Sequence, residues 1–354
     1  MNDLQPPEFA SRNTANLTPY LLRLLGGESL TEKDASSAFE VIMTGDAHHA
    51  EMGALLALLA TRLPTTDELT GAARVMRGKV DALDTGFEPN ELLDTAGTGG
   101  APKTFNVSTA AAIVAAASGA RVAKHGNRSR TGRGSAEVLE ALGVNVGASR
   151  SVQKTCLREA NVCFCFAIHH HPAAKHAMPV RKALGFPTLF NLLGPLTNPA
   201  AAGRQVMGVY KAEYVPIVAE TLARLGSIRA IVMHSEDGLD EFSLGAPSRV
   251  AQVDAGEISE YTIDPEELGL QTSPYEALQA EDLNHAVALV RNTLSGDERG
   301  PARDMVLLNA AAAIHAAGLS DSIESGLTIA AQSIDFGDAI KILETLVEIS
   351  NLPE

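Results

Sequence analysis

The hydrophobic positions of the N-terminal quarter of the chain recur every three or four residues. This spacing predicts helices, because one face of an α-helix repeats every 3.6 residues. Thr31 is expected to cap the helix that follows it, and Thr65 or Thr66 the helix that contains DELTGAARVM. Glycine and proline then interrupt the pattern from residue 86 to residue 91. We therefore expect a small all-helical domain over residues 1–88.

Beyond that segment, short β-like runs alternate with alanine-rich helical patterns. ELLDTAG, RVAKH, VCFCFA, AIVMHS and SRVAQV are typical of strands, whereas TAAAIVAAASG, GSAEVLEALG, YVPIVAETLARLG and ARDMVLLNAAAAIHAAG are typical of helices. Such alternation predicts a large α/β domain with a central, mostly parallel sheet flanked by helices. We assign residues 89–171 and 200–354 to this domain. The segment 172–199, richer in proline and glycine, is expected to join the helical domain as a hinge or helical segment.

Composition narrows the classes of function. No run of 18 apolar residues occurs and the chain starts with the polar MNDLQPPEFA, so we expect a cytoplasmic protein. Cys156, Cys163 and Cys165 are expected to be small buried hydrophobes rather than disulfide or zinc ligands. A net charge of −15 disfavours binding to nucleic acid or to a membrane surface.

The charge is unevenly distributed along the chain. No carboxylate occurs between Asp94 and Glu137, and this gap contains six cations. A basic segment in an acidic protein indicates a small polyanionic ligand, although a chance fluctuation of charge is the alternative. The six cations are Lys103, Arg121, Lys124, Arg128, Arg130 and Arg133.

Two glycine-rich loops each follow a predicted strand and precede a helix. In DTAGTGGAPKTFNVST, residues 94–109, glycines allow close approach of the backbone to a ligand, and polar side chains at the helix start add donors. In KHGNRSRTGRGS, residues 124–135, cations and hydroxyls suit phosphate or pyrophosphate. Tight turns and a solvated basic loop are the alternatives. Together the loops favour a ligand with phosphates at both ends.

Two further clusters could carry chemistry. Asp240 and Glu241 follow the strand-like AIVMHS, where hard oxygen ligands would suit Mg²⁺, although neighbouring acids are also common on surfaces. The histidines of HHHPAAKHAMPVRKALG, residues 169–185, point in different directions along the chain, which disfavours zinc. In the same segment Arg181 could pair with a carboxylate or simply lie exposed on a helix.

These segments resemble one family closely. GTGG before TFNVSTAAA, KHGNRS before GSAEVLEALG, HHHPAAKHAMPVRKALG, FNLLGPLTNP and DGLDEFS occur in the order found in anthranilate phosphoribosyltransferases, over nearly the whole chain. The resemblance implies transfer of the 5-phosphoribosyl group from phosphoribosyl pyrophosphate (PRPP) to the amine of anthranilate, the second step of tryptophan synthesis from chorismate. It also implies an active site between the two domains and a homodimer formed through the helical domains.

The resemblance assigns roles to individual residues. No residue is required as a general base. The residues implied to bind PRPP are Gly97, Thr98, Gly99, Gly100, Thr104, Asn106, Ser108, Thr109, Lys124, Asn127, Arg128, Ser129 and Thr131. Those implied to bind anthranilate are Gly97, His125, Asn127 and Arg181, and those implied to hold Mg²⁺ are Ser108, Asp240 and Glu241.

Three departures from the usual family pattern are present. Ala101-Pro102-Lys103 stands where an Asp usually follows GTGG, so a cation replaces a carboxylate. Two Mg²⁺ ions per subunit are possible, but we expect one dominant site and weak inhibition by excess Mg²⁺. The second loop is shorter around Thr131, and Phe186-Pro187 replaces a basic residue before Thr188.

Two other functions remain as alternatives. Pyrimidine nucleoside phosphorylases share the fold and a KHG-type loop but need no metal, which the Asp240 and Glu241 pair argues against. A noncatalytic relative that binds nucleic acid through the basic loops is disfavoured by the net charge of −15.

Overall fold

A computed structural model describes residues 16–129 and 131–353. Arg130 of the predicted basic loop and residues 1–15 of the predicted helical domain lie outside the described residues. The helical part comprises α1 (Thr18–Leu25), α2 (Glu32–Thr44), α3 (His49–Ala60) and α4 (Thr66–Gly78). Thr31 caps α2, and Thr65 and Glu68 form a reciprocal capping box at the start of α4, as predicted.

A later segment of the chain packs against these four helices. It contains α8 (Ala167–His170), a short 3-10 helix (Pro172–His176), α9 (Met178–Leu184) and α10 (Leu189–Leu193). Contacts of α9 with α3 and of α10 with α3 and α4 favour the predicted association of this segment with the helical domain. The domain boundaries themselves stay predictions.

The α/β part is built on a seven-stranded sheet with the order β3-β2-β1-β4-β5-β6-β7. Pairing is parallel from β3 to β5 and antiparallel from β5 to β7, so the predicted fold class is confirmed. The strand-like runs of the sequence did not predict β4 or β7. The strands are β1 (Leu92–Asp94), β2 (Arg121–Gly126), β3 (Val162–Phe166), β4 (Arg204–Gly208), β5 (Arg229–Ser235), β6 (Ser248–Asp254) and β7 (Glu257–Ile263).

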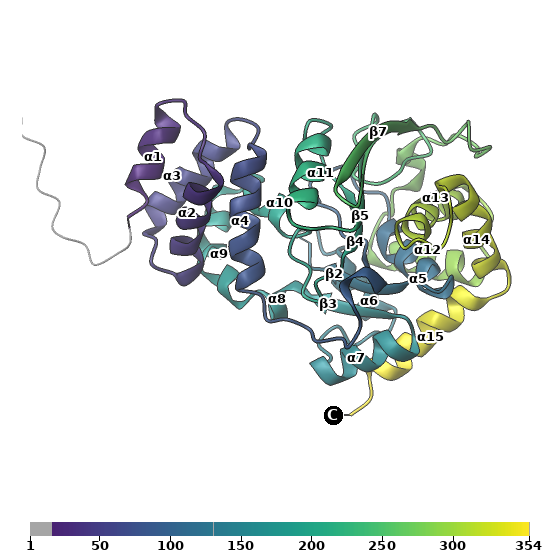
Figure 1. Cartoon of the computed structure of the whole chain (residues 1–354). Helices are drawn as coiled ribbons and strands as arrows, with labels where there is room; N and C mark the ends of the chain where they lie inside the picture. The colour runs from purple at the N-terminus through teal and green to yellow at the C-terminus, as the bar shows by residue number, and fades with distance from the viewer. Residues whose placement is uncertain (1–15, 130, 354) are drawn as a thin grey trace, which may run out of the picture.

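Helices cover both faces of the sheet. On one face α5 and α13 pack together and α13 reaches β4 and β5, while α11 covers the other face and also contacts α4 (Figure 1). Two further 3-10 helices are Pro89–Glu91 and Tyr275–Leu278. The helices are α5 (Val107–Ala117), α6 (Ser135–Ala141), α7 (Arg150–Glu159), α11 (Tyr214–Arg224), α12 (Leu283–Ser295), α13 (Pro301–Ala316), α14 (Ile323–Asp335) and α15 (Asp338–Ser350).

The sheet separates two hydrophobic cores. Successive side chains of a strand point to opposite faces, so Ile231 joins the core with α5 and α13, and Val232 joins the core under α11. The second core continues into the helical part, where it includes the fully buried Leu56 and Leu193. The helical part and one face of the sheet therefore share a single apolar core.

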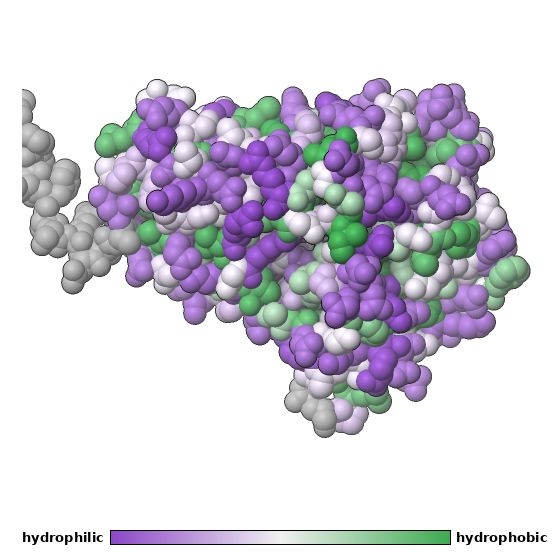
Figure 2. Space-filling view, in the orientation of Figure 1, coloured by the Kyte–Doolittle hydropathy of each residue, from purple (hydrophilic) through white to green (hydrophobic). Residues whose placement is uncertain are grey.

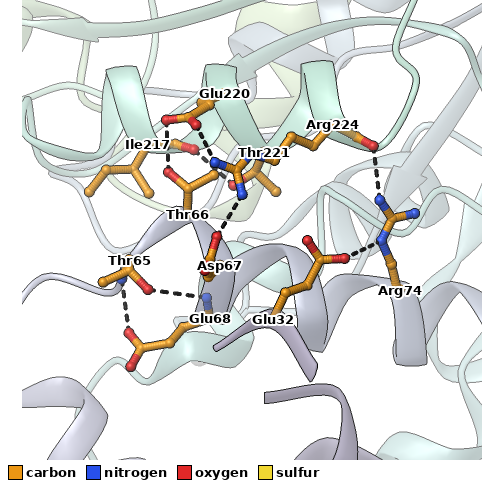
Figure 3. A network of polar contacts seen from close by, with 10 residues as sticks. All are labelled: Glu32, Thr65, Thr66, Asp67, Glu68, Arg74, Ile217, Glu220, Thr221 and Arg224. Atoms are coloured by element: carbon orange, nitrogen blue, oxygen red, sulfur yellow. Dashed lines mark hydrogen bonds and ion pairs between the residues drawn. The ribbon is translucent and has the colours of Figure 1, made fainter. Parts of the chain in front are cut away.

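Polar contacts reinforce this junction between α4 and α11 (Figure 3). The Thr66 hydroxyl donates to Glu220 over 3.0 Å, and Arg224 donates to Asp67 over 2.6 Å. Arg74 donates to the carbonyl of Arg224 over 3.1 Å. These contacts hold α4 of the helical part against α11 of the α/β part.

The surface and the cysteines agree with the composition. Figure 2 shows that hydrophilic residues predominate on the viewed face, with small hydrophobic patches between them. Within the described residues, no helix is both long and apolar enough to cross a membrane. Cys156, Cys163 and Cys165 are buried and free, as expected from the sequence.

Candidate active site

The two glycine-rich loops and the acidic pair meet at one edge of the sheet. They follow β1, β2 and β5, three strands of the parallel region whose carboxyl ends lie at the same edge. A cavity of about 300 Å³ opens there. The sequence-predicted residues that line it are Gly97, Thr98, Gly99, Thr104, Asn106, Ser108, Lys124, His125, Asn127, Arg128, Ser129, Asp240 and Glu241.

Glycines allow the first loop and the acidic segment to approach each other closely. Gly99 and Gly100 have φ of 61° and 96°, a backbone conformation that favours glycine. A Cβ on Gly97 would lie 3.3 Å from Oδ2 of Asp240, and a Cβ on Gly208 would overlap the backbone of Asp240. The carbonyl of Gly208 also accepts a hydrogen bond from the Thr98 N–H over 2.9 Å. Gly208, at the end of β4, thus contacts both the first glycine-rich loop and the acidic segment.

Asp240 and Glu241 form the acidic side of the cavity. Asp240 accepts a hydrogen bond from the N–H of Gly99, and Glu241 accepts from the Thr104 hydroxyl over 3.0 Å and from the N–H of Ser108. Burial raises the pKa of Asp240 to about 6. Burial and the neighbouring Asp240 raise the pKa of Glu241 to about 8. The site therefore holds two carboxylates whose ionised forms need a nearby cation.

Lys124 forms the buried basic side. It is 3% exposed and its ammonium donates to the carbonyl and hydroxyl of Thr95 and to the hydroxyl of Ser108, over 3.1–3.3 Å. Burial lowers its pKa to about 8, although Asp94 and Glu241 favour the charged form. This places a positive charge at the base of the cavity, between the two glycine-rich loops.

The second loop is held by its own side chains. Arg128 pairs with Glu140 through two hydrogen bonds of 2.6 and 2.7 Å, and its guanidinium lies 5.5 Å from the ring centre of Phe166. Ser129 accepts a hydrogen bond from the N–H of Arg133 over 3.0 Å. The Arg128 guanidinium is therefore already paired, and the Ser129 hydroxyl is held inside the loop.

His125 is fixed by hydrogen bonds on both sides. Its backbone N–H donates to Oδ1 of Asp94 over 3.0 Å, and its ring Nε2 lies 3.1 Å from Nε2 of His171. Burial, followed by the neighbouring His171 and His170, lowers the pKa of His125 well below its ordinary value. At neutral pH the ring is uncharged and a poor proton donor or acceptor.

The other histidines have protein partners. His170 donates from Nδ1 to the carbonyl of Asp81 over 2.8 Å and contacts Arg150 and Gln153 through Nε2. Burial lowers its pKa to about 4. Across the described residues, no group of three or more His, Cys, Asp or Glu side chains is arranged to hold a metal ion.

Four sequence-predicted residues are not among those that line the cavity. Gly100 lies beside the ring of Tyr210, and Thr109 is buried on the inner side of α5. Thr131 receives a hydrogen bond from Lys103. The guanidinium of Arg181 lies 5.0 Å from the ring centre of Phe190. The proposed roles of these residues stay predictions.

The structure also brings to the cavity residues that were not assigned to a particular ligand. Lys103 and Arg133 line the cavity, and their position in the carboxylate-free segment was the available signal. Ala286 reaches the cavity from α12. No local pattern marks that residue, because only the tertiary packing of α12 against α5 and α6 brings it there.

Comparison with known proteins agrees with this geometry. Residues 89–340 match a glycosyl transferase family, a/b domain, and residues 18–80 its helical bundle domain. An anthranilate phosphoribosyltransferase of Rubrobacter xylanophilus is 46% identical, over 94% of this chain and 97% of that protein.

Solved structures give the same family. The structure of anthranilate phosphoribosyltransferase from Thermus thermophilus has a TM-score of 0.87 and 40% identity, covering 94% of this chain and 99% of that chain. The enzyme of Saccharomyces cerevisiae in complex with PRPP and Mg has a TM-score of 0.84 and 26% identity, with coverage of 94% and 97%. Identity and coverage at these levels show that the chain belongs to the anthranilate phosphoribosyltransferase family.

Proposed function

We propose that this chain transfers the 5-phosphoribosyl group of PRPP to the amine of anthranilate, releasing pyrophosphate and forming N-(5-phosphoribosyl)anthranilate. This reaction is the second step of tryptophan synthesis from chorismate. The observation that carries the proposal is the meeting of two glycine-rich loops, the buried Lys124 and the acidic pair in one cavity. The yeast relative's complex with PRPP and Mg supports the same ligands here.

The acidic pair fits a magnesium ion. Asp240 and Glu241 offer hard oxygen ligands, and their raised pKa values mean that a cation would stabilise their ionised forms. With Ser108, they are the residues that we propose to hold Mg²⁺. Bound there, Mg²⁺ would neutralise charge that develops on the departing pyrophosphate. One dominant site, with a second ion possible, remains our proposal.

The protein contributes position and electrostatics. The amine of anthranilate is already unprotonated at neutral pH, so no general base is required. The backbone of Gly97–Gly99, the hydroxyl of Ser108 and the ammonium of Lys124 would hold the phosphates. Holding the amine near the anomeric carbon then lowers the barrier by proximity.

Anthranilate would approach from the side of the second loop. His125 and Asn127 line the cavity there, and the uncharged His125 ring avoids a full charge beside the aromatic amine. We propose that Arg181 pairs with the carboxylate of anthranilate, which requires its side chain to leave the ring of Phe190. Movement of the helical part that closes the cavity would also exclude water, the competing nucleophile.

The alternative functions are less well supported. A pyrimidine nucleoside phosphorylase that uses free phosphate would not require the acidic pair beside the phosphate loops. A nucleic-acid-binding role would have to overcome the net charge of −15. Neither accounts for Asp240 and Glu241 contacting the first glycine-rich loop.

We further propose a homodimer formed through the helical part. Leu22 and Leu25 of α1 are 64% and 68% exposed, and Met178 of α9 is 52% exposed. Exposed apolar side chains of this size on two helices that both pack against α3 favour a protein interface. Light scattering coupled to gel filtration would test the dimer, and Leu25→Glu should weaken it. The cytoplasmic location expected from the sequence stays a prediction.

Loss of anthranilate fluorescence in the presence of PRPP and Mg²⁺ tests the proposed reaction. The unaltered protein should consume anthranilate only when both are present. Asp240→Ala and Glu241→Ala should abolish this activity, whereas Arg181→Ala should mainly raise the KM for anthranilate. A folded protein with no turnover would refute the proposal, and phosphorolysis and nucleic-acid binding would be tested next.

A further inference from the structure

Within the described part of the chain, four cations line the cavity, and three already have strong partners. Lys124 is surrounded by three protein oxygens. Arg128 forms a two-bond ion pair with Glu140. Arg133 donates to the carbonyl of Ala280. The fourth, Lys103, has a different environment.

The Lys103 ammonium donates to the hydroxyl of Thr131 over 3.2 Å, which links the first glycine-rich loop to the second. Its side chain is otherwise exposed, and no carboxylate among the described residues forms an ion pair with it. Partial burial and the neighbouring Arg133 lower the pKa of Lys103, while the charges of Asp240, Glu137 and Glu241 act in the opposite direction. Lys103 is therefore a weakly bound cation at the edge of the cavity.

The backbone that follows Lys103 is well anchored, and the residue that precedes it has little conformational freedom. Pro102 precedes it and restricts the backbone dihedral φ. Thr104 follows it, is 2% exposed, donates its hydroxyl to Glu241 and accepts the N–H of Ala280 at its carbonyl. The side chain can thus change partner without movement of the loop.

We propose that Lys103 is a pyrophosphate-binding residue whose ammonium leaves Thr131 for a phosphate oxygen beside Asp240 and Glu241 when PRPP binds. This inference rests on the proposed function, because it assigns the pyrophosphate group of PRPP to this cavity. A charged phosphate adds the attraction of opposite charges to the hydrogen bond of the ammonium, which the neutral Thr131 hydroxyl does not offer. The exchange of partners is therefore favourable.

The position also predicts a consequence for the cation requirement. Lys103 places a fixed positive charge near the acidic pair, where it would share the neutralisation of the pyrophosphate with a single Mg²⁺ ion. Lys103→Met should therefore shift the Mg²⁺ concentration for half-maximal activity upward, and Lys103→Arg should not.

Calorimetric titration with inorganic pyrophosphate, with and without Mg²⁺, tests the binding role directly. Lys103→Met should weaken pyrophosphate binding roughly 10- to 100-fold, the loss expected for one hydrogen bond to a charged group. Lys103→Arg should retain most of the affinity. Lys33→Met, which removes an exposed lysine of α2 outside the cavity, is the matched control and should bind like the unaltered protein. Unchanged affinity in Lys103→Met would overturn the inference.

Steady-state kinetics and a second variant separate binding from structural support. Lys103→Met should raise the KM for PRPP and leave the KM for anthranilate unchanged. Thr131→Val removes the resting partner, and adding Lys103→Met to it should still weaken pyrophosphate binding. A double variant that binds as tightly as Thr131→Val alone would show that the pair only ties the two loops together. If pyrophosphate binding depends on Lys103 but anthranilate is not consumed, the inference stands and the proposed function fails.

Discussion

Asp240 and Glu241 lie on one side of the cavity and Lys124 on another, and burial acts on both in the same sense. It raises the pKa of the two carboxyl groups and lowers the pKa of the ammonium, so each side is pushed toward its neutral form. Unlike the partners of an ordinary ion pair, the charges of the two sides only partly stabilise each other. The cavity is therefore suited to ligands that bring the missing charges, a cation for the acidic side and an anion for the basic side.

The two sides of the cavity also have different hydrogen-bond partners. The acidic side is held mainly by backbone N–H groups and one hydroxyl from the first glycine-rich loop. Lys124 is held by oxygen atoms of Thr95 and Ser108. Since both sets come from the segment that runs from the end of β1 to the first turn of α5, displacement of that segment would disturb both charges at once.

Removal of an acidic charge should have the largest effect. Glu241→Gln keeps the shape of the side chain but removes the charge proposed to hold Mg²⁺, so kcat/KM should fall roughly 100- to 1000-fold. The fold should persist, because Gln avoids the cost of burying an ionised carboxylate. Anthranilate fluorescence and circular dichroism would measure the two effects. Retention of full activity by both Glu241→Gln and Asp240→Asn would contradict the proposed metal site.

Removal of the buried ammonium should have the next largest effect. Lys124→Met retains much of the apolar stem but loses the charge at the base of the cavity, so the KM for PRPP should rise roughly 10- to 100-fold. The KM for anthranilate should change much less. Similar increases in both constants would show that Lys124 shapes the whole cavity instead of serving the phosphate side.

Gly208→Ala should separate the acidic segment from the first glycine-rich loop. A Cβ there overlaps the backbone of Asp240, which cannot turn aside as a side chain could. We expect the free energy of unfolding to fall by about 1–3 kcal/mol and activity to fall about tenfold. Gly78→Ala is the matched control, since nothing lies within 4 Å of its Cβ position at the end of α4. Equal stability of the two variants would argue against the close contact at Gly208.

The two sides of the cavity should give opposite dependences of stability on pH. Glu241 has a folded pKa of about 8, above its ordinary 4.5, so its contribution to stability is lost as pH rises from 4.5 to 8. Lys124 has a folded pKa of about 8, below its ordinary 10.5, so stability should increase as pH rises from 8 to 10.5. Thermal unfolding across this range should show both trends. Glu241→Gln should remove the first and Lys124→Met the second; a variant that leaves its trend unchanged would refute the corresponding shift.

The sequence was most informative where local chemistry is sufficient. Caps at Thr31 and Thr65, the alternation of strands and helices, and the two glycine-rich loops all follow from short-range patterns. The residue types and position of the acidic pair already suggested a Mg²⁺ site, and the resemblance to a family implied the same role. The contact of Asp240 with Gly208 and the arrival of Ala286 from α12 could not be predicted, because they depend on tertiary packing.

The same difference between short-range patterns and tertiary packing explains why β7 and the pairing of Arg128 were not predicted. β7 carries mostly exposed side chains, so no apolar alternation reveals it. Arg128 was assigned to PRPP from its charge, yet it is paired with Glu140. A sequence shows that a cation is present but does not show which carboxylate has already bound it.

Arg128→Met is therefore expected to affect activity less than Glu241→Gln, Lys124→Met or Gly208→Ala. The guanidinium is exposed and already paired with Glu140, and exposed ion pairs contribute little because water screens them. Activity should remain within about twofold of the unaltered protein, and the melting temperature should hardly change. Steady-state kinetics at low and high salt would measure this. A rise in the KM for PRPP as large as that of Lys124→Met would show that Arg128 leaves Glu140 to bind phosphate, and the basic side of the cavity would then include the second loop's arginine as well as the buried lysine.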